Sequence, residues 1–175
     1  MKTTFSTLGA ALLALAVVTA PASAADAPTD PQIAHIAYSA GAIDVEAAEL
    51  ALSKTRNPAV KAFAESMRTD HEAVNQMALA LVKKLHVTPQ DNATSQALAK
   101  AAKAKSAELR KLGGAVFDEA YIRNEIAFHR QVNGALETLL IPSARNPELK
   151  SLLETGLKLF QGHQQHAEHV ASELK

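Results

Sequence analysis

Four stretches of this chain carry apolar residues at helical spacing, and a polar side chain interrupts each apolar face. The interrupting residues are Asp44, His71, His129 and His163. Apolar residues at i, i+3, i+4 and i+7 predict amphipathic helices whose apolar faces pack against one another. A polar residue in such a face needs a partner inside the core. The pattern therefore predicts helices that meet around a buried polar cluster.

Good capping residues mark where the predicted helices begin. Asp30, Asn57 and Asn146 each precede a proline, so a favourable N-cap residue comes before a residue suited to the first helical position. With glycine and proline as stop signals, the predicted helices cover about 31–55, 58–86, 95–112, 116–141 and 147–174. No segment alternates with a period of two, so the predicted fold class is all-α.

The order of these helices predicts the architecture. Short connections join the first two helices and the last two, as in αα-hairpins, and the helix at 95–112 lies in a long crossover between them. This connectivity is that of a ferritin-like four-helix bundle with an extra crossover helix. We expect residues 31–175 to form this single domain, after a flexible mature N-terminus at 25–30.

The first 24 residues have the features of a secretory signal peptide. Lys2 is followed by an apolar run at 8–18 and by the small residues Ala22-Ser23-Ala24. We therefore expect cleavage after Ala24 and Sec-type export to a bacterial periplasm. The apolar run is shorter than the ~20 residues that cross a bilayer, and no later run is longer, so no membrane span is predicted.

Composition removes several classes of function. The chain has no cysteine, which excludes disulfides, zinc–thiolate sites and thiol catalysis. Its 18 basic and 18 acidic residues balance and it has no tryptophan, so no nucleic-acid partner is expected. No G-x-S-x-G motif supports serine catalysis. A homo-oligomer and an envelope partner both stay open.

One local basic run interrupts this balance. It lies on the predicted crossover helix and consists of Lys100, Lys103, Lys105, Arg110 and Lys111. A solvated helix face explains it most simply, and contact with an anionic envelope surface is the alternative.

The four interrupting residues lie at matched depths. Asp44 and His71 lie 13 and 14 residues from Asn57, and His129 and His163 each lie 17 residues from Asn146. At 1.5 Å per residue these positions are ~20–25 Å from the hairpin turns, near the middle of each helix. The side chains are therefore expected to converge.

Two hypotheses account for such a cluster. In the first, His71, His129 and His163 bind a transition metal, with Asp44 as fourth ligand or as hydrogen-bond acceptor; imidazole and carboxylate suit zinc, copper or iron. Asp70 is then a candidate to orient an imidazole from outside the ligand set. In the second, the same groups bond to each other, to Tyr121 or to water, and fix helix register without metal. An enzymatic role ranks third, because it would further need an open coordination position, which a sequence does not display.

Other ligand arrangements are disfavoured. Bis-histidine haem ligation is conceivable in a bundle, but no C-x-x-C-H attachment site occurs. His163, His166 and His169 form an H-x-x-H-x-x-H run, in which the last two fit adventitious metal binding at the surface.

The chain resembles the bacterial family called domain of unknown function 4142, which is grouped with ferritin-like proteins. The likeness covers about 31–174 and rests on the segments 41–46, 60–64, 114–121 and 157–163, with Asp70-His71 and His129. The resemblance implies an exported ferritin-like bundle, associated with the envelope or with stress, in which His71, His129 and His163 are the family's histidine positions. Asp44 stands where the family commonly has glutamate. Di-iron chemistry is not implied, because no histidine here follows a glutamate by three residues.

Overall fold

The computed structural model describes residues 27–174, which form a bundle of long helices. The elements are α1 (Asp30–Lys54), α2 (Pro58–Lys84), α3 (Ala93–Arg110), α4 (Gly114–Ala135), the π-helical segment η1 (Leu136–Leu140), α5 (Ile141–Ser143) and α6 (Pro147–Glu173). No strand occurs in this part of the chain. The predicted signal peptide at 1–24 and the first two residues of the predicted flexible segment lie outside the described residues.

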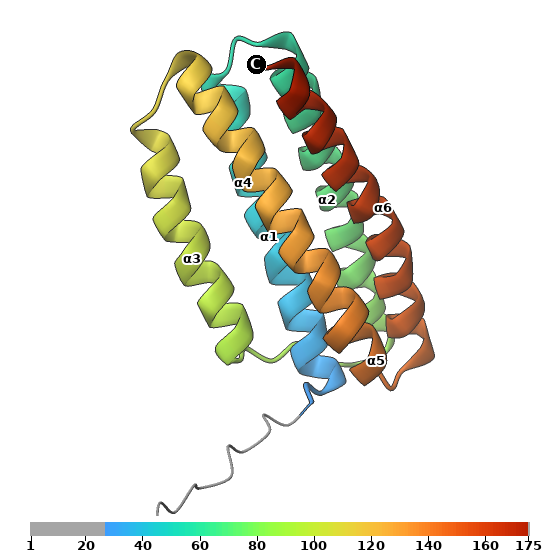
Figure 1. Ribbon diagram of the computed structural model, residues 1–175. Coiled ribbons are helices and arrows are strands. Elements are labelled where there is room, and N and C mark those ends of the chain that lie inside the picture. The colour runs from blue at the N-terminus through green and yellow to red at the C-terminus, as the bar shows by residue number, and fades with distance from the viewer. Residues whose placement is uncertain (1–26, 175) are drawn as a thin grey trace, which may run out of the picture.

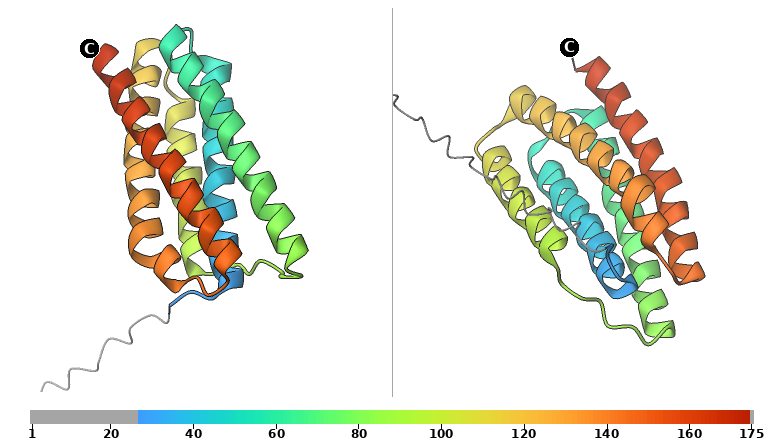
Figure 2. Two further views of the ribbon diagram at one scale, coloured as in Figure 1. Left: turned by 90° about the vertical axis from the view of Figure 1, so that its right-hand side faces the viewer. Right: turned by 60° about the horizontal axis from the view of Figure 1, so that its bottom comes forward.

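Two antiparallel hairpins build the bundle, as the sequence predicts. Helix α1 packs against α2, α4 packs against α6, and α2 meets α6 across the core. Helix α3 lies outside this set of four and packs mainly on α1 (Figure 1). It carries the chain from the end of α2 to the start of α4, so it is the crossover helix (Figure 2).

Two of the three predicted N-caps are confirmed, and the third, at Asp30, is wrong. The side chains of Asn57 and Asn146 accept backbone hydrogen bonds at the starts of α2 and α6. Helix α1 instead begins after Thr29, which forms a capping box with Gln32. Asp30 is the first helical residue, and its carboxylate accepts the backbone N–H groups of residues 145 and 146 at 2.8 and 2.9 Å.

The fourth predicted helix, at 116–141, is longer and less regular than expected. It begins at Gly114, whose φ of 56° is a backbone conformation that glycine adopts easily. At its other end, the helical backbone continues past Pro142 to Ser143. Proline has no N–H to donate and its ring crowds the carbonyl four residues earlier. The chain accommodates Pro142 by widening into η1 immediately before it, where the Ile141 N–H reaches the carbonyl of Leu136.

A polar layer divides the core into two apolar halves. One half, near the α1–α2 turn, is built around Phe63, Phe117 and Tyr121. The other, near the α4–α6 turn, is built around Ile33, Leu153 and Phe160. The buried polar residues Asp44, Glu125 and the three core histidines lie between them.

The half of α2 beyond His71 packs less tightly than the first half. All buried residues of α2 lie between Val60 and His71. Figure 2 (left) shows the end of α2 leaning away from the neighbouring ends of α1 and α6. The bundle is therefore closed on one side of the polar layer and looser on the other.

Across residues 27–174, no helix combines the length and apolar character needed to cross a membrane.

Replacing Asp30 by alanine should destabilise the bundle although the residue is only partly buried. The carboxylate ties the start of α1 to the turn before α6 through two charge-assisted hydrogen bonds. We expect the free energy of unfolding, measured by urea denaturation, to fall by about 1–3 kcal/mol. Glu49→Ala, at an exposed position of the same helix, should change it by less than ~0.5 kcal/mol. Equal losses in the two variants would remove this role from Asp30.

Candidate metal centre

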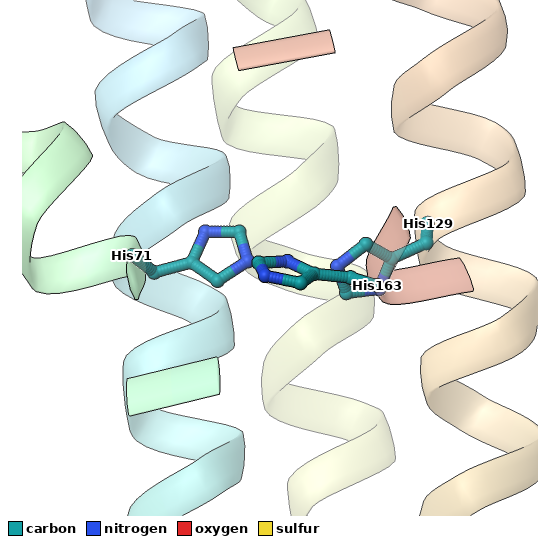
Figure 3. A group of neighbouring side chains, drawn as sticks. All are labelled: His71, His129 and His163. Atoms are coloured by element: carbon teal, nitrogen blue, oxygen red, sulfur yellow. The ribbon is translucent and has the colours of Figure 1, made fainter. Parts of the chain in front are cut away.

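Three histidines from three helices meet in the middle of the core. His71 comes from α2, His129 from α4 and His163 from α6, and none is more than 5% exposed. Their ring centroids lie 5.2–5.6 Å apart. One ring nitrogen of each lies within 4.8 Å of one ring nitrogen of each other. Figure 3 shows the rings pointing toward one another, so the convergence predicted from helix depth is confirmed.

In two of the imidazoles, one ring nitrogen makes a hydrogen bond that holds the ring in place. His163 Nε2 lies 2.9 Å from Asp70 Oδ2, and His129 Nδ1 lies 3.0 Å from the Glu125 carbonyl oxygen. Because a carboxylate and a carbonyl can only accept, each of these nitrogens must donate its N–H. The other nitrogens, His163 Nδ1 and His129 Nε2, then carry lone pairs. Neither has a hydrogen-bond partner among the described residues.

His71 is held by packing rather than by hydrogen bonds. Its ring stacks on Phe160 with centroids 4.6 Å apart and an interplanar angle of 14°. Its Nε2 lies 3.3 Å from Asp44 Oδ2, without hydrogen-bond geometry. Both ring nitrogens therefore lack a hydrogen-bond partner within residues 27–174.

A second carboxyl, Glu125, joins the cluster and is missing from the set predicted by the sequence. It is 1% exposed on α4, one turn before His129. Asp44, Glu125 and His129 each place one polar atom within 4.8 Å of the other two. The signal is present in the sequence, because residues four apart share a helix face. The di-iron pattern, with glutamate three residues before histidine, does not include it.

Burial keeps the three imidazoles of the cluster uncharged. It lowers the pKa of His71 to about 2 and of His129 to about 4, and the neighbouring imidazoles add to the effect. The pKa of His163 is also lowered by burial, although Asp70 opposes the shift. All three rings are therefore neutral at pH 7, which is the form that binds metal ions.

The two buried carboxyls behave as a pair. Burial raises the pKa of Glu125 to about 7. Burial and the charge of Glu125 raise the pKa of Asp44 well above its ordinary value. Two carboxyls this close cannot both ionise easily, so they share a proton. The close approach of His71 to Asp44 is consequently a contact of neutral groups rather than an ion pair.

The two predicted supporting residues lie in different surroundings. Asp70 is about two-fifths exposed and contacts His163 directly, in the position expected for a residue that orients a ligand. Tyr121 is fully buried against Phe63 and Phe117. Its hydroxyl has no hydrogen-bond partner in the described part of the chain. Burial, followed by the charges of the two carboxyls, raises its pKa.

The remaining histidines of the α6 run lie outside the cluster. His169 is exposed and lies 3.3 Å from Glu173, its neighbour one turn later. His166 is exposed, and its ring makes a T-shaped contact with Phe63 at 5.2 Å between centroids. Only His163 of this run faces the core.

The donor atoms present suit a transition metal. Neutral imidazole nitrogens and carboxylate oxygens are ligands for zinc, copper and iron. The core supplies three of the first kind and two carboxyls of the second. The lone pairs of His129 and His163 are already oriented by their outer hydrogen bonds, as is usual for metal-binding histidines.

Comparison with known proteins identifies a family and a fold. The model of the family described as domain of unknown function, DUF4142, matches residues 16–170. A candidate secreted DUF305 protein from Streptomyces coelicolor is structurally similar, with a TM-score of 0.69 at 11% identity over 82% of this chain and 91% of that one. A DUF305 fragment from Deinococcus radiodurans has a TM-score of 0.71 at 15% identity, over 84% and 98%. At such identities the two structures establish the shared fold alone. No curated protein matches the chain.

Glu125→Gln should change how stability depends on pH in the metal-free protein. Burial raises the Glu125 pKa from 4.5 to about 7, so the folded state holds a proton that the unfolded chain releases above pH 4.5. This contribution to stability is complete below pH 4.5 and is lost as the pH rises through about 7. At about 1.4 kcal/mol per pH unit, the loss reaches about 3 kcal/mol.

The variant cannot undergo this titration. Its free energy of unfolding relative to the wild type should therefore rise by about 3 kcal/mol between pH 4.5 and pH 8. Urea denaturation in the presence of a chelator measures this difference, with the exposed Glu49→Gln as control. Wild-type and variant profiles that stay parallel over this range would contradict a raised Glu125 pKa.

Proposed function

This chain belongs to the DUF4142 family, and we propose that it binds one transition metal ion in its core, through His71, His129 and His163 with Asp44. Neutral nitrogen ligands and one carboxylate favour zinc, copper or iron. With the predicted signal peptide at 1–24, the protein would hold this metal in the periplasm. Storage, buffering or sensing of the ion suits a site buried this deeply better than catalysis does, because a substrate would need an open coordination position.

The observation that carries the proposal is the set of convergent nitrogens without partners. A buried polar group without a hydrogen bond costs about 1–3 kcal/mol. His71, His129 and His163 present such nitrogens to one another, and no bond links the three rings within residues 27–174. A metal ion would satisfy all three nitrogens at once.

We assign the Asp44 carboxylate as the fourth ligand from its distance to His71. Zinc binds imidazole and carboxylate at about 2.0–2.2 Å in tetrahedral geometry, so two of its ligand atoms lie about 3.3–3.5 Å apart. His71 Nε2 and Asp44 Oδ2 are separated by 3.3 Å. Binding needs this carboxylate ionised, so uptake of metal should displace the proton that Asp44 shares with Glu125.

His129 limits the site to one ion. It belongs both to the histidine group and to the group with Asp44 and Glu125. Its Nδ1 donates to the Glu125 carbonyl, so Nε2 is its single lone pair. His129 can therefore bind one ion at a time. We assign Glu125 the role of sharing a proton with Asp44, and not the role of a metal ligand.

The alternative is a metal-free bundle in which the same cluster fixes helix register for envelope stress tolerance. The bonds from His163 to Asp70 and from His129 to the Glu125 carbonyl support it, because they link α6 to α2 and hold the ring against α4. It leaves the inward-facing nitrogens unexplained. The metal-binding proposal accounts for both the outer bonds and the inner lone pairs.

Titration of zinc into the chelator-treated protein by isothermal calorimetry tests the proposal. The wild type should bind one ion per chain. His71→Ala, His129→Ala and His163→Ala should each weaken binding by more than about 100-fold, because each removes a ligand. Asp70→Asn should weaken it by about 10-fold, because it loosens the orientation of His163.

His169→Ala is the matched control, since it removes an exposed histidine from the same helix as His163. Its zinc affinity should equal that of the wild type. Melting temperatures separate the two hypotheses. Zinc should raise the melting temperature of the wild type and leave that of His129→Ala unchanged. A metal-free structural cluster predicts that His129→Ala is destabilised equally with and without zinc.

A further inference from the structure

The looser half of the bundle encloses an apolar chamber that the metal site does not use. Its volume is about 590 Å³, within the ~300–1,000 Å³ range of small-molecule sites. All five long helices and η1 line it. Its side chains are apolar apart from Asn75, Thr94 and Gln131, and none is charged.

Phe160 separates the chamber from the histidines. It lines the chamber and stacks on His71 with centroids 4.6 Å apart. The chamber is therefore separate from the histidine cluster, and binding of a ligand in it would not require the metal.

Helix α3 covers the chamber without filling it. Its buried residues are Ser95 and Leu109, one near each end. Between them, Ala97, Leu98 and Ala101 face the chamber, and two of these three side chains are alanine methyl groups. Small residues there leave space between α3 and the groove formed by α1 and α4. The crossover helix is therefore fixed at its ends and spans an apolar space at its middle.

The chamber opens beside this helix. Six of its lining residues are exposed to solvent, and all six lie on α3, α4 or η1: Ala93, Thr94, Ala97, Ala101, Gln131 and Leu139. The residues contributed by α1, α2 and α6 are buried or half-buried. An apolar molecule could enter between α3 and α4 and come to rest against α1, α2 and α6.

The shape favours a long, narrow ligand. Along α4 and η1 the lining runs from Phe128 to Leu140, which is about 18 Å at 1.5 Å per residue. An extended hydrocarbon chain can therefore lie along this lining.

A positive charge near the chamber favours one orientation of a bound chain. The exposed residue Lys105 lies one turn after Ala101 on α3, and Ala101 lines the chamber. Lys105 also lines a smaller cavity of about 190 Å³ that adjoins the chamber at Ala101, Phe128 and Gln131. Glu46 lines the same cavity, and Lys105 pairs with Glu108, so the cationic character is local rather than strong.

From this shape, lining and charge, we propose that the chamber binds a single linear acyl chain, with its anionic end toward Lys105. A free fatty acid and a lysophospholipid share that chemistry. Uncharged apolar molecules of similar width should enter with lower affinity, since they gain burial of apolar surface but no contact with lysine.

Fluorescence of N-phenyl-1-naphthylamine tests the chamber in chelator-treated protein with residues 1–24 removed. The probe should become brighter with the wild type, and palmitate should displace it. Ala78→Phe places a ring in the chamber from α2 and should weaken both affinities at least 10-fold, while the melting temperature holds or rises because space is filled. Ala80→Phe adds the same ring to an exposed position of α2 outside the lining and should bind like the wild type.

A second variant that fills the chamber keeps the proposal testable if Ala78→Phe fails to fold. Ala37→Leu adds a smaller side chain to the lining from α1 and should weaken palmitate binding in the same direction. Displacement of the probe by lysophosphatidylglycerol but not by palmitate would retain the acyl chain with an anionic end and identify its source as a lysolipid. The proposal is overturned if neither acyl ligand binds the wild type, or if folded Ala78→Phe and Ala37→Leu bind palmitate as the wild type does.

Discussion

The core of this bundle buries imidazole nitrogens that no hydrogen bond satisfies within residues 27–174. Burial keeps His71, His129 and His163 neutral, and outer hydrogen bonds hold two of the three rings with a lone pair facing inward. No hydrogen bond links the three rings within residues 27–174. The bundle therefore bears an energetic cost at its centre that an apolar layer would avoid. A bound cation would offset that cost, and Asp44 and Glu125 would supply a compensating negative charge by giving up their shared proton.

The polar layer also explains how the rest of the fold is arranged. On one side of it, aromatic packing around Phe63 and Tyr121 fixes four helices closely, which sets the depth of each histidine. On the other side α2 diverges, α3 spans an alanine-lined space, and Phe160 closes the end nearest the histidines. Tight packing where ligand geometry matters and looser packing where a chain can enter would let one small domain carry two sites. Neither site needs the other in order to form.

Much of this architecture was predictable from the sequence, because helical periodicity and Asn-Pro starts are local signals. The same periodicity placed the three histidines at one depth. Glu125 could also have been found, since it is one turn from His129. Other features depend on contacts between distant segments. By sequence Asp30 is a better cap than Thr29, but the turn before α6 engages the Asp30 carboxylate and Thr29 caps the helix instead. The widening before Pro142 and the chamber under α3 likewise arise from how the helices meet.

Anomalous X-ray scattering tests the central claim most directly. Crystals grown with one equivalent of zinc per chain would be measured on either side of the zinc absorption edge. We predict one anomalous peak per chain, enclosed by His71, His129 and His163 and within about 2.0–2.2 Å of Asp44 Oδ2. A core without any peak, with zinc instead at the exposed His166 and His169, would contradict the account. The histidines would then be a structural layer of a metal-free bundle.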